Sequence, residues 1–425
     1  MALALGRKVY ALQEGTRNAI YKRETGRAMQ RVQVITSETQ VRGRVRPLRG
    51  VCKGTIIMSK NKAIIAIIIV FGLVVFGQLL LMDNSFPVTT GDFNRHANAK
   101  VDGEEMLYLG EWLLALVVAN ATKVLDTSLS SFYLWANYII LFGIGTVLCL
   151  VISNTVNKKA GLLTIPIAMF CTQSLLKLFA WGTIFSIANM FLVLPLTLLF
   201  LAKWLTQKKV IYALLSLVSL IVFSLFHPSS LYLPFALGIF LAGFALYKTI
   251  KKQQKEAIVT YSTGGAVLSL HFALVFSSPI LFGGLTDGVT SRLLATIQNG
   301  LQMTLSPIEF LYIYLSPATL GIACVAIAGL LQYRREIIVK EETKLSLLMF
   351  ISFMPALAIG TFTNLAFEMS RHAADLSTVV AIVTACLAGI VLTSHKSKLL
   401  TIVIIGIVSI GTVPTLATWF GVQGI

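Results

Sequence analysis

The feature of this sequence that most restricts its fold is a series of long apolar runs separated by short polar stretches. A run of about 20 apolar residues is long enough to cross the hydrocarbon core of a bilayer as a helix. Charged residues make up only 12% of the chain, about half the share found in a typical soluble domain. We therefore predict an all-α polytopic membrane protein with about eleven transmembrane helices, near residues 63–82, 132–153, 161–180, 182–202, 210–226, 231–247, 257–282, 308–332, 345–366, 373–393 and 399–419.

Lysine and arginine are divided unequally between the two alternating sets of connections. One set holds fifteen of them and the other holds six, and the remaining fourteen precede residue 63. Because connections rich in lysine and arginine stay in the cytoplasm, the N-terminus is predicted to be cytoplasmic. The 83–130 region and the 283–307 loop are then outside, and the expected location is the plasma (inner) membrane. The net charge of +17 could also suggest nucleic acid, but the basic residues lie in short clusters between apolar runs, which indicates a bilayer instead.

Residues 1–57 differ in kind from the rest of the chain. They hold 12 lysines and arginines, three glutamates and no apolar period. A targeting presequence, a basic arm on anionic lipid and a disordered extension foreign to the natural product all fit this composition. Because Met58-Ser59-Lys60 before an apolar run is typical of the start of an inner-membrane protein, we predict a dispensable, disordered extension at 1–57. The transmembrane domain is then 58–425.

Four of the five cysteines fall inside apolar runs, at spacings that suit no metal site: Cys149, Cys171, Cys324 and Cys386. We predict that they are small buried apolar residues and form no disulfide framework.

The most polar stretch within the hydrophobic part of the chain is 83–112, which holds six of the eighteen acidic residues. Asp92 and His96 are four residues apart, so a helix there would place both side chains on one face, within reach of one bound group. The alternative is a solvated connector between two spans. An apolar but interrupted run at 108–125 is predicted to be a helix in the membrane interface.

Further candidates lie at the predicted outer ends of later spans. His227 and Pro228 form one turn, Arg292 lies in the 283–307 loop, and Arg371 and His372 lead into the span at 373–393. Ionisable groups at membrane depth are costly and are functional candidates for that reason. The alternative for Arg371 is a structural ion pair with Asp375, which is four residues away. His271 lies within a span and is predicted to pack between helices.

These residues resemble motifs of the C-fold membrane glycosyltransferases, the GT-C superfamily. The run Gly91 to His96 resembles the Gly-Asp-x-x-x-His signature after the first span of some members and their uncharacterised relatives. His227-Pro228 is similar to a later His-Pro turn, and Glu368 to His372 resembles an Arg-aromatic motif near the lipid carrier. The predicted layout is also similar to that of the family: one span, then a large outer loop with an interfacial helix, and then pairs of spans. The sequence departs from the family in having His372 after Arg371 and no soluble C-terminal domain.

The resemblance implies a GT-C-like fold and a polyprenyl-phosphate-linked sugar donor. Asp92 would be the general base on the hydroxyl of a glycan, lipid or protein acceptor, and His96 would orient it or bind phosphate. The resemblance also implies a set of residues that bind substrate or lipid phosphate: Arg371, His372, Arg292, His227, Arg95, Glu104 and Glu105. Glu104 and Glu105 form an acidic cluster with Asp102. Two interpretations of that acidic cluster stay open: it binds a divalent metal as a cofactor, or it is a solvated turn.

Other functions compete with this one. A transporter or flippase of lipid-linked sugars should show paired repeats with broken helices near the midplane of the membrane. A glycan polymerase or ligase would use the same chemistry at the outer face. A non-catalytic scaffold predicts no clustering of Asp, His and Arg on one side.

Overall fold

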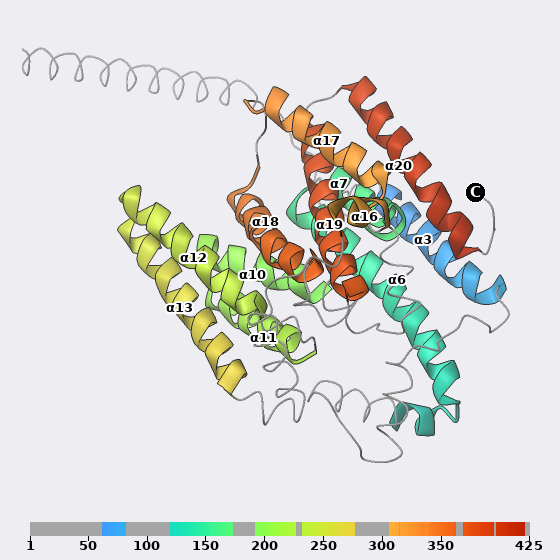
Figure 1. The fold of residues 1–425 in the computed structure, drawn as a ribbon, viewed down its shortest axis with the longest axis horizontal. Helices are drawn as coiled ribbons and strands as arrows, with labels where there is room; N and C mark the ends of the chain where they lie inside the picture. The colour runs from blue at the N-terminus through green and yellow to red at the C-terminus, as the bar shows by residue number, and fades with distance from the viewer. Residues whose placement is uncertain are drawn as a thin grey trace, which may run out of the picture. The chain divides into compact units, whose positions relative to one another are not determined.

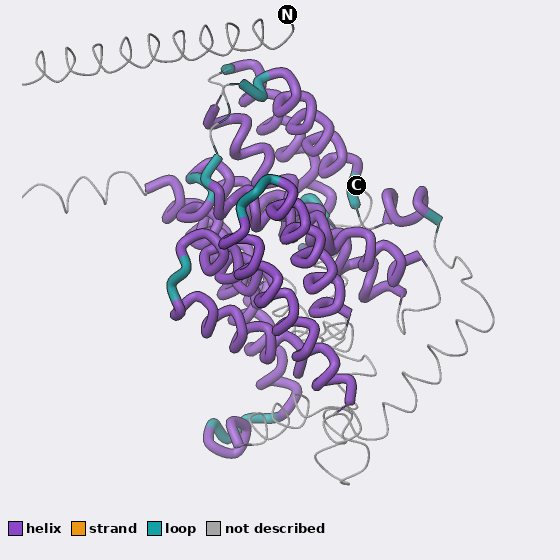
Figure 2. Tube along the Cα trace, turned by 90° about the vertical axis from the view of Figure 1, so that its left-hand side faces the viewer, coloured by secondary structure: helices purple, strands orange, loops and turns teal. Residues whose placement is uncertain are grey.

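The structure is a computed structural model, and it describes ten main stretches of the chain. They are residues 62–81, 120–172, 192–226, 232–276, 306–313, 315–335, 337, 339–362, 369–394 and 397–420. The chain divides after Asn61, and the described residues belong to the unit Lys62–Ile425. Within these stretches the chain is helical, with one isolated β-bridge and no strand (Figure 2). The all-α prediction is confirmed for this part of the chain, whereas the predicted 1–57 extension lies outside it.

The described helices follow the predicted apolar runs (Figure 1). In chain order they are α3 (Lys62–Leu81), α6 (Leu129–Thr155), α7 (Lys158–Thr164) with the π-helix η1 (Ile165–Phe170), α10 (Leu194–Gln207), α11 (Val210–Phe226), α12 (Tyr232–Ile250), α13 (Gln254–Phe276), α16 (Pro307–Ile313), α17 (Pro317–Gln332), α18 (Glu341–Phe362), α19 (Met369–Ser394) and α20 (Lys398–Trp419). Four of them, α3, α6, α19 and α20, are long and apolar enough to cross a membrane. The total of about eleven spans stays a prediction.

Local sequence explains where several helices begin and end. The hydroxyl of Ser128 accepts a hydrogen bond from the backbone N–H of Ser131 (3.2 Å) and caps α6. Asn157 caps α7 in the same way through Ala160, and such side-chain caps satisfy N–H groups that have no partner inside the helix. The turns that join α10 to α11 and α12 to α13 each contain a lysine with positive φ, Lys208 (57°) and Lys252 (60°).

Helix α19 is the most buried of the four candidate spans. Most of the residues in Leu376–Ser394 are buried, whereas fewer than a quarter of those in the apolar stretches of α3 and α20 are. It packs against α7, α17 and α18. A methyl group on Gly389 would lie only 2.3 Å from the Cα atom of Ala160 on α7, so the two backbones approach as closely as small residues allow. Helix α19 is therefore central to the packing of this unit.

Helices α3 and α6 run antiparallel. The ring of Phe71 lies against Gly145, and nearer the other end of the pair the hydroxyl of Tyr138 donates to Oε1 of Gln78 (2.9 Å), with both residues buried. The C-terminal end of α3 therefore lies beside the beginning of α6.

Five connections meet at one end of the bundle, which we call the lysine end. They follow α6, α10, α12, α17 and α19, and they are the same five connections that carry the fifteen lysines and arginines of the predicted cytoplasmic set. The contacts that join them are Lys159 Nζ donating to Leu392 O, Thr343 Oγ1 to Thr155 O (2.8 Å), Gln207 Nε2 to Glu342 Oε1 (3.1 Å), and the charge interactions of Lys208 with Glu256 and Lys248. The five connections that the charge count assigns to one side of the membrane therefore also lie together in the structure.

This arrangement gives a topology prediction. A cysteine placed at Gln253, in the turn between α12 and α13, should not react with a membrane-impermeant thiol reagent added outside intact cells, whereas one at Asn98 should react. Both positions are tested in a variant without the native cysteines, because Cys324 is exposed. Labelling of Gln253→Cys but not of Asn98→Cys would reverse the orientation and remove the basis for an outer site.

Candidate functional site

Helical segments from two distant parts of the chain end beside one another. Helix α7 and its continuation η1 end at Phe170, and α16 ends at Ile313 before α17 begins at Pro317. Between these ends, Thr172 and Leu315 form an antiparallel β-bridge. We call Cys171, Thr172, Leu315 and Ser316 the helix break. The predictions of one continuous helix over 161–180 and over 308–332 are therefore wrong.

A proline lies close to each of these helix ends. Pro166 has no backbone N–H for the ordinary α-helical hydrogen bond, and the chain there takes the wider π-helical pattern, in which the N–H of Cys171 donates to Pro166 O (2.8 Å). Pro317 occupies the first turn of α17, and the Ser316 hydroxyl caps that turn by accepting from the N–H of Thr319 (3.4 Å). The Ser316 cap and the proline in the first turn are both normal at the start of a helix and unfavourable inside one.

The helix break is enclosed by protein. Cys171, Thr172 and Leu315 are buried, as is Thr319, whose hydroxyl donates to Cys171 O (3.4 Å). The Cys171 thiol donates to Val408 O on α20 (3.7 Å). Non-helical backbone at membrane depth is tolerated only where protein or a water-filled cavity surrounds it, and here helices supply that environment.

Helix lengths place the break away from the lysine end. The seven residues of α7 and six of η1 rise less than about 20 Å, because a π-helix rises less per residue than an α-helix, and the sixteen of α17 rise about 24 Å. The hydrocarbon core is about 30 Å thick. The break therefore lies beyond the middle of the bundle, on the side away from the lysine end.

The beginning of α19 adjoins this region. Leu376 and Leu315 share one buried cluster, and Ser377 and Thr378 are buried next to it along the helix. The predicted candidates Arg371 and His372 belong to the first turn of α19. Their backbone is thus within two helical turns of Leu376, while their side chains lie outside the described part.

The other predicted site residues lie outside the described residues: Asp92, His96, Arg95, Glu104, Glu105, His227 and Arg292. The helix ends that flank their segments are described. They are the C-terminal ends of α3, α11 and α13 and the N-terminal ends of α6 and α12, all opposite the lysine end, while α16 follows the segment of Arg292. The candidates therefore belong to segments that start at the same end of the bundle as the helix break.

The predicted metal ligands and most of the predicted interfacial helix lie outside the described residues. In the described stretches no three His, Cys, Asp or Glu side chains come together as metal ligands, but Asp102, Glu104 and Glu105 lie outside those stretches. Of the interfacial helix predicted at 108–125, only residues 120–125 are described, and 120–124 are helical.

The four described cysteines are free thiols, and Cys149, Cys171 and Cys386 are buried as predicted. The prediction is wrong for Cys324, which is exposed on α17. An apolar environment also exists on the outside of a transmembrane helix, where a thiol can face lipid as a small apolar group. The ring of His271 packs against Phe235 and Phe272, with ring centroids 5.5 and 5.4 Å apart, as expected of a packing histidine.

No protein-family model and no curated protein matches this sequence. The functional argument therefore rests on the residues and on the arrangement of the helices.

Sequence reasoning missed Thr172, Leu315 and Thr319. The available signals were Pro166 inside one apolar run and the Ser316-Pro317 pair inside another, because Ser-Pro is a typical helix start. Nothing in the local sequence indicates that the two interruptions are neighbours.

Proposed function

We propose that this protein is a membrane glycosyltransferase that moves a sugar from a polyprenyl-phosphate-type lipid donor to an acceptor at the outer face of the membrane. The observation that carries the proposal is the position of Arg371 and His372 in the first turn of α19, the most buried candidate span. That turn lies at the end of the bundle opposite the lysine end, where the segments with the other candidates begin.

A phosphate is well suited to this turn. The free N–H groups and the dipole of a helix favour an anion at its N-terminus. An arginine in the same turn adds a planar pair of donors that can hold two phosphate oxygens at once. In the proposed reaction, Arg371 and His372, with Arg95, Arg292 and His227, stabilise the negative charge on the departing lipid phosphate.

The proposed chemistry at the sugar needs a proton acceptor. Asp92 takes the proton from the acceptor hydroxyl, the hydroxyl oxygen bonds to the anomeric carbon, and the bond from that carbon to the phosphate oxygen breaks. His96 orients the acceptor or binds phosphate. Glu104 and Glu105 contact sugar hydroxyls, or with Asp102 hold a divalent metal that neutralises the phosphate.

A flippase for lipid-linked sugars is the second candidate, and the helix break favours it. Transporters bind their substrates between discontinuous helices, typically near the midplane of the bilayer. Here the end of η1 and the start of α17 are neighbours, but they lie on the side of the bundle away from the lysine end, and Cys171, Thr172 and Leu315 are buried. This position favours a transferase over a transporter. A glycan polymerase or ligase would share the chemistry of the first proposal.

Proteoliposomes that contain the full chain and a polyprenyl-phosphate-linked fluorescent sugar separate these functions. A transferase moves the label from the lipid to a supplied acceptor. A flippase changes the accessibility of the labelled lipid to a membrane-impermeant quencher without moving the label to another molecule. Translocation without transfer, across a range of acceptors, would contradict the transferase.

The substitution Arg371→Lys tests the proposed phosphate contact. It keeps the positive charge and loses the two-pronged grip, so KM for the donor should rise about tenfold or more while kcat changes less. The matched control is Arg334→Lys, at an exposed position of the lysine end, which should leave both constants unchanged. Wild-type kinetics for Arg371→Lys would remove the phosphate contact from the proposal.

A further inference from the structure

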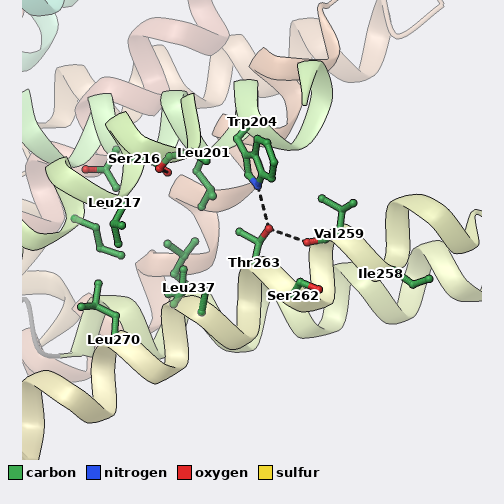
Figure 3. Close-up of a pocket in the computed structure, with 15 residues that line it drawn as sticks. Leu201, Trp204, Ser216, Leu217, Leu237, Ile258, Val259, Ser262, Thr263 and Leu270 are labelled. Carbon is green, nitrogen blue, oxygen red and sulfur yellow. Dashed lines mark hydrogen bonds between the residues drawn. The ribbon is translucent and has the colours of Figure 1, made fainter. Parts of the chain in front are cut away.

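A cavity of about 400 Å³ lies between the hairpins α10–α11 and α12–α13 (Figure 3). Its walls are mostly apolar, with Leu201, Leu217, Leu237 and Leu270 among the side chains that face it. Small-molecule sites in proteins have typical volumes of about 300–1,000 Å³ and are lined mainly by apolar groups. The cavity is therefore large enough for a ligand and suited to an apolar one.

The few polar side chains in the wall are mostly engaged within the protein. The hydroxyls of Thr197, Ser216 and Thr263 each donate to a carbonyl of their own helix, at 2.7 to 2.8 Å. The indole N–H of Trp204 donates to the Thr263 hydroxyl (3.1 Å) and so links the two hairpins (Figure 3). A polar ligand would find few free partners here, whereas a hydrocarbon chain needs none.

The cavity opens sideways and lies close to the lysine end. Leu217 and Ile258 line it and are also exposed, by 46% and 64%, so the opening faces the surroundings of the helices. Most lining residues belong to the halves of α10, α11 and α13 that adjoin the lysine end. In a membrane, this opening faces the acyl chains of the leaflet on the lysine side.

Lysines surround the end of the cavity. Lys209, Lys251, Lys252 and Lys255 are exposed in or beside the turns of the two hairpins. Lys208 joins them, and its pKa is lowered by burial and by Lys248, against an opposing effect of Glu256. Lys248 and Glu256 form an ion pair with each other, and the other five lysines leave the local charge positive. Lys208 of one turn lies close enough to Lys248 and Glu256 of the other hairpin for their charges to interact.

We propose that this cavity holds one acyl chain of an anionic phospholipid from the leaflet at the lysine end, and that the lysines of the two hairpin turns hold its phosphate. A cavity of about 150 Å³ is enough for benzene, so this one accommodates a segment of a chain. Basic pockets between transmembrane helices on the cytoplasmic side are recognised sites for anionic headgroups. This site lies at the opposite end of the bundle from the proposed transferase site and does not depend on it.

Trp204 provides a direct probe because it lines the cavity. The full chain is reconstituted into phosphatidylcholine bilayers that contain phosphatidylglycerol with brominated acyl chains, which quench tryptophan fluorescence on contact. The contribution of Trp204 is the difference between wild type and Trp204→Phe. Half-maximal quenching should need a mole fraction of brominated phosphatidylglycerol at least about fivefold lower than that of brominated phosphatidylcholine, since each nearby lysine contributes about fivefold.

Two matched pairs of variants locate the headgroup and the chain. Lys208→Gln with Lys252→Gln should remove most of the preference, whereas Lys340→Gln with Lys398→Gln, two exposed lysines on other connections of the same end, should retain it. Ala266→Phe should abolish quenching of Trp204 by filling the cavity. Gly265→Phe, at a neighbouring position with open space beside it, should not.

Equal quenching by both lipids would mean general contact with the bilayer and would overturn the proposal. Retention of the phosphatidylglycerol preference in Lys208→Gln with Lys252→Gln would overturn the headgroup contact. Undiminished quenching in Ala266→Phe would show that the chain lies outside the cavity, and the proposal would fail on that result as well.

Discussion

Replacing Asp92 with asparagine is expected to lower kcat for sugar transfer by about 10²- to 10⁴-fold, the usual contribution of a general base. Asparagine keeps the shape of the side chain but cannot accept the proton of the acceptor hydroxyl. Donor binding does not use that proton, so KM for the lipid donor should stay close to the wild-type value. Transfer of a labelled sugar in proteoliposomes measures both constants.

The control for this loss is Asp83→Asn, which removes one negative charge from the same polar stretch. It should retain most of the activity, because the effect of Asp92→Asn is attributed to proton transfer and not to the charge of the loop. Full transfer activity in Asp92→Asn would show that the base is another group. An equal loss in both variants would show that the net charge of the stretch is what matters.

The second large effect concerns stability. Gly389→Ala on α19 would place a methyl group 2.3 Å from the Cα and N atoms of Ala160, and these are backbone atoms that cannot rotate away. The helices α7 and α19 would have to separate, and overpacking of this kind costs about 1–3 kcal/mol. We expect a lower Tm for the purified protein in detergent, measured by the loss of the monodisperse peak after heating.

Gly406→Ala on α20 is the matched control, because no heavy atom lies within 4 Å of the position its methyl group would take. Alanine is also the better helix former by up to about 1 kcal/mol, so Tm should be unchanged or slightly higher. A Tm for Gly389→Ala equal to that of Gly406→Ala would mean that the contact between α7 and α19 is looser than the structure describes.

The sequence predicted helices well where polar residues bound an apolar run. The run at 210–226 coincides with α11, because lysines precede it and His227-Pro228 follow it. The predicted 373–393 corresponds to α19, which begins four residues earlier and therefore includes Arg371 and His372. Hydropathy did not detect that boundary because charged residues can form a first helical turn outside the apolar core.

The helix break could not be predicted in the same way. Its bridge joins Thr172 to Leu315, and the hydrogen bond from Thr319 to Cys171 spans 148 residues. Hydropathy averaged over a window is insensitive to a helix end that falls inside an apolar run. For the candidate site, residue types and charge asymmetry indicated Asp92, His96, His227 and Arg371, but their convergence on one cavity stays a prediction.

The position of α7 has a consequence for how the protein is made. This helix and η1 are too short to cross a bilayer alone, and the hydrogen bond from Lys159 to Leu392 joins residues 233 positions apart. During translation, α7 therefore leaves the ribosome long before its partner α19 exists. Until then the face of α7 that packs against α19 has no permanent neighbour, although α6 already covers another face. The insertion machinery therefore has to shelter that open face, and chains that stop before α19 are expected to be degraded.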